Sequence, residues 1–195
     1  NGARSGSGGS GGGLPWQEAR KILMCDMAEA GVAPSARCFA AAISACASAA
    51  RVNEALELLN FMTENSDHNS SSSPKSPNMS SVVPFEVPRP DVWCFGAAIA
   101  ACEKVHDGGL ALSLLADMEG KHKITPDVVT LNTVLSACAK AGLYGCALEV
   151  FHKGFQRHGL KPNRISFNTM INACAVASKK TTTAAAAAAA AATTS

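Results

Sequence analysis

Aromatic and charged side chains are both scarce in this chain of 195 residues. Phe, Trp and Tyr make up 5% of the sequence, and Asp, Glu, Lys and Arg make up 16%. A β-sandwich core draws on more aromatic and β-branched residues, whereas the abundant alanine favours closely packed helices. The formal net charge of +2 is not the strongly basic footprint that would by itself indicate nucleic-acid binding, yet it is compatible with it. The composition therefore predicts an all-α protein and leaves its partner open.

The sequence also lacks the short motifs that carry catalysis or metal binding. It contains no Cys-x-x-Cys pair, no Gly-x-Ser-x-Gly and no P-loop lysine motif, and its five histidines have no Cys or acid at ligand spacing. No apolar run approaches the roughly 20 residues that span a bilayer. We therefore expect no enzyme activity, no metal, no cofactor, no small-molecule substrate and no membrane partner.

Eight cysteines are present, but their spacing does not fit a disulfide framework. Four of them occupy one equivalent position in successive units of the chain: Cys46, Cys102, Cys138 and Cys174. Equivalent positions in stacked units lie about one repeat apart, which is beyond disulfide reach. The cysteines are predicted to be buried thiols in a reducing compartment.

A six-residue motif recurs every 36 residues. Pro-Asp-Val-Trp-Cys-Phe at 90–95 is followed by Pro-Asp-Val-Val-Thr-Leu at 126–131 and by Pro-Asn-Arg-Ile-Ser-Phe at 162–167. After each copy of this motif, apolar residues at i, i+4 and i+7 predict a first helix, and a second apolar stripe predicts a helix that packs against it. A fixed period of this size indicates a solenoid in which each unit contacts mainly its neighbours.

Changes in composition predict the domain boundaries. Residues 1–13 form a Gly/Ser-rich linker, and 14–180 form the array, with about three complete and two partial repeats. Residues 65–88, rich in Ser and Pro, interrupt the period and are predicted to be a disordered insertion. Residues 181–195 form a Thr/Ala tail. The chain begins with Asn1 rather than Met, so we expect a fragment of a larger array.

Two sets of repeating positions have no evident role in packing. One set directly follows the aromatic residue or Leu of each first helix: Ala40, Gly96, Asn132 and Asn168. The other follows each opening proline: Ser35, Asp91, Asp127 and Asn163. Helix capping explains the residue types of the second set. An Asn inside a helix is less expected, and its amide can read a base edge, while Lys104 and Lys140 could contact phosphates. A solvated helix face explains the same residues equally well.

The unit 128–163 resembles a pentatricopeptide repeat. The resemblance rests on Val-Val-Thr-Leu-Asn-Thr-Val-Leu-Ser-Ala-Cys-Ala-Lys-Ala-Gly at 128–142, Ala-Leu-Glu-Val-Phe at 147–151 and Gly-Leu-Lys-Pro-Asn at 159–163, and it extends over about residues 16–177 outside the insertion. Tetratricopeptide repeats are similar, but their Trp-x-x-Leu-Gly-x-x-Tyr signature is absent. The resemblance implies a right-handed superhelix of antiparallel helical hairpins. It also implies single-stranded RNA binding in mitochondria or chloroplasts, one base per repeat.

The resemblance further implies roles for individual residues. Asn132 with Asn163 resembles a pyrimidine reader that favours C over U, and Asn168 also suggests a pyrimidine. The pairs of Gly96 with Asp127 and of Ala40 with Asp91 depart from the usual residue types. Two further side chains match the family's position that wedges between bases, namely Val129 and Ile165, whereas Trp93 and Arg37 depart from it.

The function implied by the resemblance is RNA binding in organellar RNA processing, stability, editing or translation, with other RNA-processing proteins as further partners. Two alternatives remain at this point. One is a protein–protein interaction scaffold, and the other is the RNA-targeting arm of an enzyme whose catalytic domain lies outside this chain.

Overall fold

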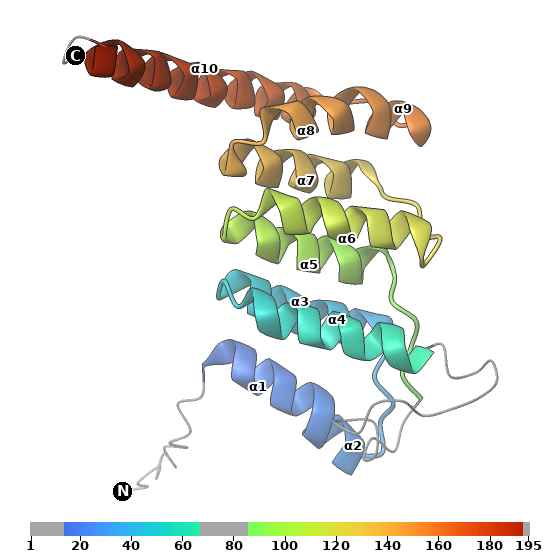
Figure 1. Cartoon of the computed structure of the whole chain (residues 1–195). Helices are drawn as coiled ribbons and strands as arrows, with labels where there is room; N and C mark the ends of the chain where they lie inside the picture. The colour runs from blue at the N-terminus through green and yellow to red at the C-terminus, as the bar shows by residue number, and fades with distance from the viewer. Residues whose placement is uncertain (1–13, 67–85, 193–195) are drawn as a thin grey trace, which may run out of the picture.

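The structure is a computed structural model that describes residues 14–66 and 86–192. Over these residues it consists of helices in two stacked layers without strands (Figure 1). The helices are α1 (Pro15–Lys21), the π-helical turn η1 (Ile22–Asp26), α2 (Met27–Glu29), α3 (Ala36–Ser48), α4 (Val52–Ser66), α5 (Val92–Lys104), α6 (Gly108–Gly120), α7 (Val128–Ala141), α8 (Tyr144–Glu149), the π-helical turn η3 (Val150–Gly154), α9 (Phe155–Arg157) and α10 (Arg164–Ala192).

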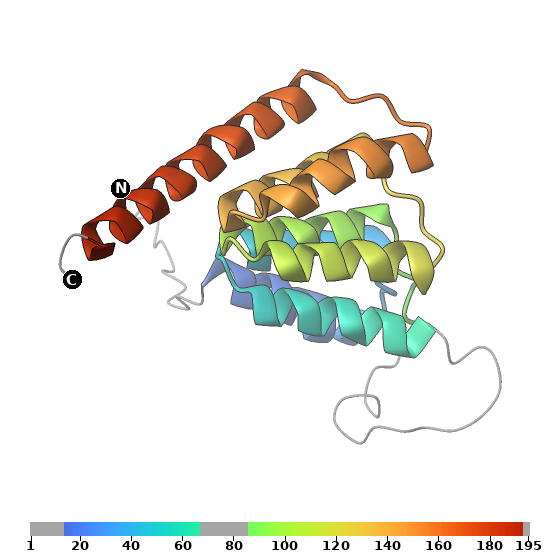
Figure 2. The ribbon, with the colours of Figure 1, turned by 45° about the horizontal axis from the view of Figure 1, so that its top comes forward.

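The helices are arranged as hairpins that stack along one axis. In the first layer α3, α5, α7 and α10 contact one another in sequence order. The second layer is formed by α4, α6 and the continuous run α8–η3–α9, each antiparallel to the helix before it (Figure 2). The run α1–η1–α2 packs against α3 at the other end of the stack. This arrangement confirms the predicted all-α solenoid of antiparallel helical hairpins.

Acidic side chains cap the N-termini of several of these helices. The carboxylate of Asp91 accepts hydrogen bonds from the backbone N–H groups of Trp93 and Cys94, and that of Asp127 accepts from Thr130. These bonds satisfy N–H groups that have no partner inside the helix, and they place negative charge at the positive end of the helix dipole. Asp91 and Asp127 thereby set where α5 and α7 begin.

Equivalent apolar residues of successive units form one continuous core. Phe39, Phe95 and Leu131 occupy the same position of α3, α5 and α7, and each is at most 1% exposed. Their counterpart on α10, Phe167, is 52% exposed, because among the described residues no second helix pairs with α10 as α8 pairs with α7.

The burial of the cysteines likewise depends on their position in the stack. Cys46, Cys102 and Cys138 are buried as expected, and all eight cysteines are free thiols. The prediction was wrong for Cys25 and Cys174, which are exposed, while Cys38 and Cys146 are only partly buried. On α10 the Cys174 thiol lies 3.7 Å from the Tyr144 hydroxyl.

The predicted boundaries meet the structure only in part. The linker 1–13 lies outside the described residues, as does most of the insertion 65–88, although α4 continues to Ser66. Helix α10 crosses the predicted boundary at residue 180 and runs on to Ala192. None of the helices in the described ranges combines the length and the apolar character needed to cross a membrane.

Candidate functional site

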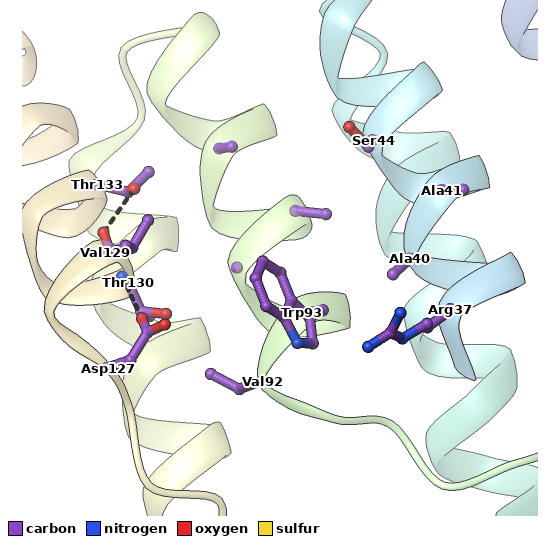
Figure 3. A pocket seen from close by; sticks show the side chains of 13 residues that line it. Arg37, Ala40, Ala41, Ser44, Val92, Trp93, Asp127, Val129, Thr130 and Thr133 are labelled. Carbon is purple, nitrogen blue, oxygen red and sulfur yellow. Dashed lines mark hydrogen bonds between the residues drawn. The ribbon is translucent and has the colours of Figure 1, made fainter.

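The first-layer helices α3, α5 and α7 line an open, largely apolar groove of about 510 Å³ (Figure 3). The lining residues come from the first three turns of these helices, together with Asp127, which directly precedes α7. They include two positions of the predicted base-reading set that lack a polar side chain, Ala40 and Gly96, and one acidic position, Asp127. The groove therefore joins three successive units along one face.

A row of exposed apolar side chains runs along this groove, and two of its members, Trp93 and Val129, line it. Trp93, Val129 and Ile165 are 64%, 68% and 61% exposed, and each is the second residue of its helix. Arg37 holds the same place on α3, and Figure 3 shows its guanidinium group turned toward the Trp93 ring. Large apolar side chains exposed at one position of three consecutive units are not used in the core. Their regular exposure indicates a binding surface.

The predicted pair of Asn132 and Asn163 is in direct contact. The Nδ2 atom of Asn132 on α7 donates to Oδ1 of Asn163, just before α10, at 3.3 Å. Ser166 completes the cluster, because its hydroxyl donates to Oδ1 of Asn132 at 2.6 Å. Asn132 is only 8% exposed, whereas Asn163 lies at the surface.

The remaining positions of the reading set are arranged differently. Gly96 offers no side chain, and a Cβ atom there would lie 3.7 Å from Oγ1 of Thr130, so there is room beside it. Asn168 is exposed on α10. The capping interpretation applies to Asp91, Asp127 and Asn163, whose side chains accept backbone N–H groups at the starts of α5, α7 and α10. Ser35 makes no such side-chain cap.

The two lysines expected to contact phosphates lie toward the ends of their helices. Lys140 is engaged, since its Nζ donates to Oε1 of Glu103 at 2.8 Å. The Ser136 hydroxyl donates to the same oxygen at 2.7 Å. Burial of Glu103 acts to raise its pKa, but the hydrogen bonds from Lys140 and Ser136 outweigh this and hold the pKa below its ordinary value. Lys104, the last residue of α5, is exposed.

The structure adds Ser166 to the residues found from the sequence. Ser166 and Thr130 are 36 residues apart, and both are buried hydroxyl residues beside a position of the predicted base-reading set. This shared spacing was the signal that could have identified them. In the described part of the chain, no group of three His, Cys, Asp or Glu side chains is arranged to hold a metal ion.

Comparison with known proteins identifies one family. The family described as "Pentatricopeptide repeat domain" matches residues 89–141 and 113–176, and the related "PPR repeat" matches residues 38–66. The crystal structure of the pentatricopeptide repeat protein PPR10 from maize is similar, with a TM-score of 0.59 and 24% identity over 80% of this chain. This likeness shows the fold. The chain spans 19% of that protein. No curated protein sequence matches.

Proposed function

This chain belongs to the pentatricopeptide repeat family of RNA-binding helical repeat proteins, and on this premise we propose that it binds single-stranded RNA along its first-layer helices. The strand would follow the face formed by α3, α5, α7 and α10, and each repeat would meet one base. The chain would act as a non-catalytic adaptor.

The row of Trp93, Val129 and Ile165 is the observation that carries this proposal. Three consecutive units each present one apolar side chain at the same helical position, near a position of the predicted base-reading set and open to solvent. Single-stranded RNA exposes unpaired bases whose flat faces stack on aromatic and apolar side chains, independently of sequence. Such a row supports contact with successive bases, and Arg37 adds a guanidinium plane and a positive charge at one end.

Base selection would concentrate in one unit. The Asn132–Asn163 pair offers two amides in contact, and we assign it a pyrimidine with C preferred over U. Asn168 would favour a pyrimidine as well. The unit with Gly96 and Asp127 has one polar side chain, as does the unit with Ala40 and Asp91, so these two would bind a base chiefly by stacking.

We further propose that the protein works in a mitochondrion or chloroplast, in RNA processing, stability, editing or translation. The described repeats would meet only about three or four bases, which is a short footprint for selecting one transcript. Specificity would then require additional repeats or a partner protein.

Tryptophan fluorescence tests the proposal directly, because the chain has two tryptophans in different places. Trp93 is exposed at the groove, whereas Trp16 lies under the Arg51 guanidinium, 5.0 Å from its ring centre. In the Trp16→Phe variant Trp93 is the only reporter, and we expect titration with oligouridylate or oligocytidylate to quench it. In the matched Trp93→Phe variant Trp16 reports alone, and its emission should stay unchanged.

Affinity provides the second measurement. We expect Trp93→Ala to weaken binding of either oligonucleotide by roughly 5- to 150-fold, since a stacked base contributes about 1–3 kcal/mol. Filter binding at low salt checks this. RNA that leaves Trp93 emission unchanged and binds the Trp93→Ala variant as well as the wild type would refute the assignment of this face.

A further inference from the structure

The orientation of the Asn163 side chain is fixed by the helix that follows it. Its Oδ1 atom accepts hydrogen bonds from the backbone N–H groups of Ile165 at 2.9 Å and of Ser166 at 3.1 Å. In return, the backbone N–H of Asn163 donates to the Ser166 hydroxyl at 3.0 Å. This reciprocal arrangement caps α10. Of the two atoms of the Asn163 amide, only the oxygen can accept the backbone N–H groups, so the oxygen must face the helix. The Nδ2 group of Asn163 must therefore point away from the helix.

The orientation of Asn132 follows from that of Asn163. One atom of the Asn132 amide lies 3.3 Å from Oδ1 of Asn163 and must be the donor Nδ2, because two carbonyl oxygens at this distance would repel. The other amide atom, Oδ1, then faces the Ser166 hydroxyl at 2.6 Å.

Ser166 has a single proton to donate. Its oxygen already accepts the Asn163 N–H, and its proton is directed to Oδ1 of Asn132 at 2.6 Å in preference to Oδ1 of Asn163 at 3.2 Å. Asn132 therefore has a partner for each end of its amide. Turning the amide over would lose both bonds and would place oxygen against oxygen beside Asn163.

Both side-chain carbonyl oxygens of the pair are thus engaged inside the protein. The amide hydrogens left over are the second hydrogen of Asn132 Nδ2 and the two hydrogens of Asn163 Nδ2, and Asn163 is exposed. We propose that Ser166 is a positioning residue that locks this polarity, so that the Asn132–Asn163 pair offers N–H donors and selects a base edge with two adjacent acceptors. This inference rests on the proposed RNA binding.

Cytosine is the base that presents such an edge. Its N3 and O2 are neighbouring acceptors, whereas uracil places an N3–H donor between its two carbonyl groups. Facing the pair with uracil would bring donor against donor. The preference for C over U would therefore depend on Ser166, although Ser166 need not touch the base.

The preceding unit supplies a natural contrast. Thr130 stands where Ser166 does, and its Oγ1 lies 3.7 Å from the place where a Cβ atom of residue 96 would be. Because residue 96 is glycine, that hydroxyl has no amide to orient. Thr130 also shows that threonine is accommodated at this position, so Ser166→Thr is a conservative variant that keeps the hydroxyl, while Ser166→Ala removes it.

The test compares the full chain with the variants Ser166→Ala and Ser166→Thr. The probes are oligocytidylate and oligouridylate of equal length, so that every binding register presents the same base to the pair. We expect the wild type to bind oligocytidylate more tightly. In Ser166→Ala the ratio of the two Kd values should move toward unity by about fivefold, the size of one net hydrogen bond. Ser166→Thr should restore the ratio.

The matched control is Ser48→Ala, which removes another helical hydroxyl, one that bonds to the Ser44 carbonyl away from the pair. It should leave the ratio unchanged. If Ser166→Ala weakens both oligonucleotides equally, or if the C-to-U ratio survives, Ser166 has only a structural role and the inference is overturned while RNA binding stands. If the wild type binds neither oligonucleotide, the proposed function and the inference both fail.

Discussion

The buried cysteine thiols make the stability of this solenoid depend on pH. Burial raises the pKa of Cys94 to about 12 and the pKa values of Cys102 and Cys138 to about 11, against an ordinary value of 9.0. The cause is desolvation, which disfavours the thiolate. In the unfolded chain the same thiols ionise near the ordinary value. Between pH 9 and 11 the unfolded state therefore holds fewer protons than the folded state, and stability falls as pH rises.

A variant isolates this contribution from the titration of other groups. We expect the wild type to be more stable than Cys102→Ala/Cys138→Ala at pH 8, because the two side chains fill the core. That advantage should shrink at pH 10, since only the wild type loses stability through these thiols. Urea midpoints at both pH values measure the effect, with the exposed Cys25→Ala as control. A difference between wild type and double variant that is the same at both pH values would contradict the assigned pKa shifts.

The residues of the candidate site differ in how visible they are in the sequence. Asp91, Asp127 and Asn163 could be identified as caps because they precede helices and have the right side chains. Asn132 could be found because an asparagine is unusual inside a helix. Ser166 is harder to identify, since a serine near a helix start is ordinary and its partner Asn132 is 34 residues away in the chain. Its 36-residue spacing from Thr130 is the one sequence signal that marks it.

At the scale of helices, units with the same 36-residue period differ in their second helix. In the hairpin of α7 with α8–η3–α9, this second helix contains the π-helical turn η3. In the hairpin of α5 with α6, α6 is regular and the loop after it carries Lys123 at φ 56. The apolar stripes predicted both helices of each hairpin. They could not predict the π-helical turn η3, because such a turn depends on packing against the neighbouring hairpin.

The contact between α6 and α7 depends on one glycine. A Cβ atom on Gly108 would lie 2.9 Å from the Cα atom of Cys138 and 3.2 Å from the Ala137 carbonyl oxygen, both backbone atoms. We expect Gly108→Ala to destabilise the protein by about 1–3 kcal/mol, since the two helices must move apart. Urea denaturation measures this cost.

Gly109→Ala is the matched control on the next residue. There the nearest atom to a new Cβ is Oδ1 of Asp107 at 3.5 Å, an ordinary contact. Its stability should stay within about 0.5 kcal/mol of the wild type. Equal midpoints for the two variants would show that the close approach of α6 to α7 is not needed for the stack.

For the whole molecule, burial depends on having a neighbour. Phe167 and Cys174 repeat the sequence pattern of buried residues, yet they are exposed on α10 because the stack offers them no second helix among the described residues. Sequence periodicity therefore predicted the stacking itself. It could not predict that α10 would have no second helix packed against it among the described residues, and the burial of Cys174 was mispredicted for this reason.

The net charge of +2 offers little general attraction to RNA, so single cations on the first-layer helices should matter. One of them is Lys140, near the end of α7, whose ion pair with Glu103 joins α7 to α5. This ion pair withholds a positive charge that could meet a phosphate.

Glu103→Gln should therefore strengthen RNA binding. The glutamine can keep the hydrogen bond to Ser136, while Lys140 loses its counter-charge and becomes available to the strand. For single-stranded RNA, one additional phosphate contact steepens the slope of log K against log salt by about 0.7, and filter binding over a salt series measures that slope. Glu149→Gln is the matched control, because Glu149 pairs with Lys153 in the second layer and the change in net charge is the same. If both variants shift the slope equally, the gain reflects net charge alone. A steeper slope for Glu103→Gln only would place the RNA backbone beside Lys140, at the end of α7.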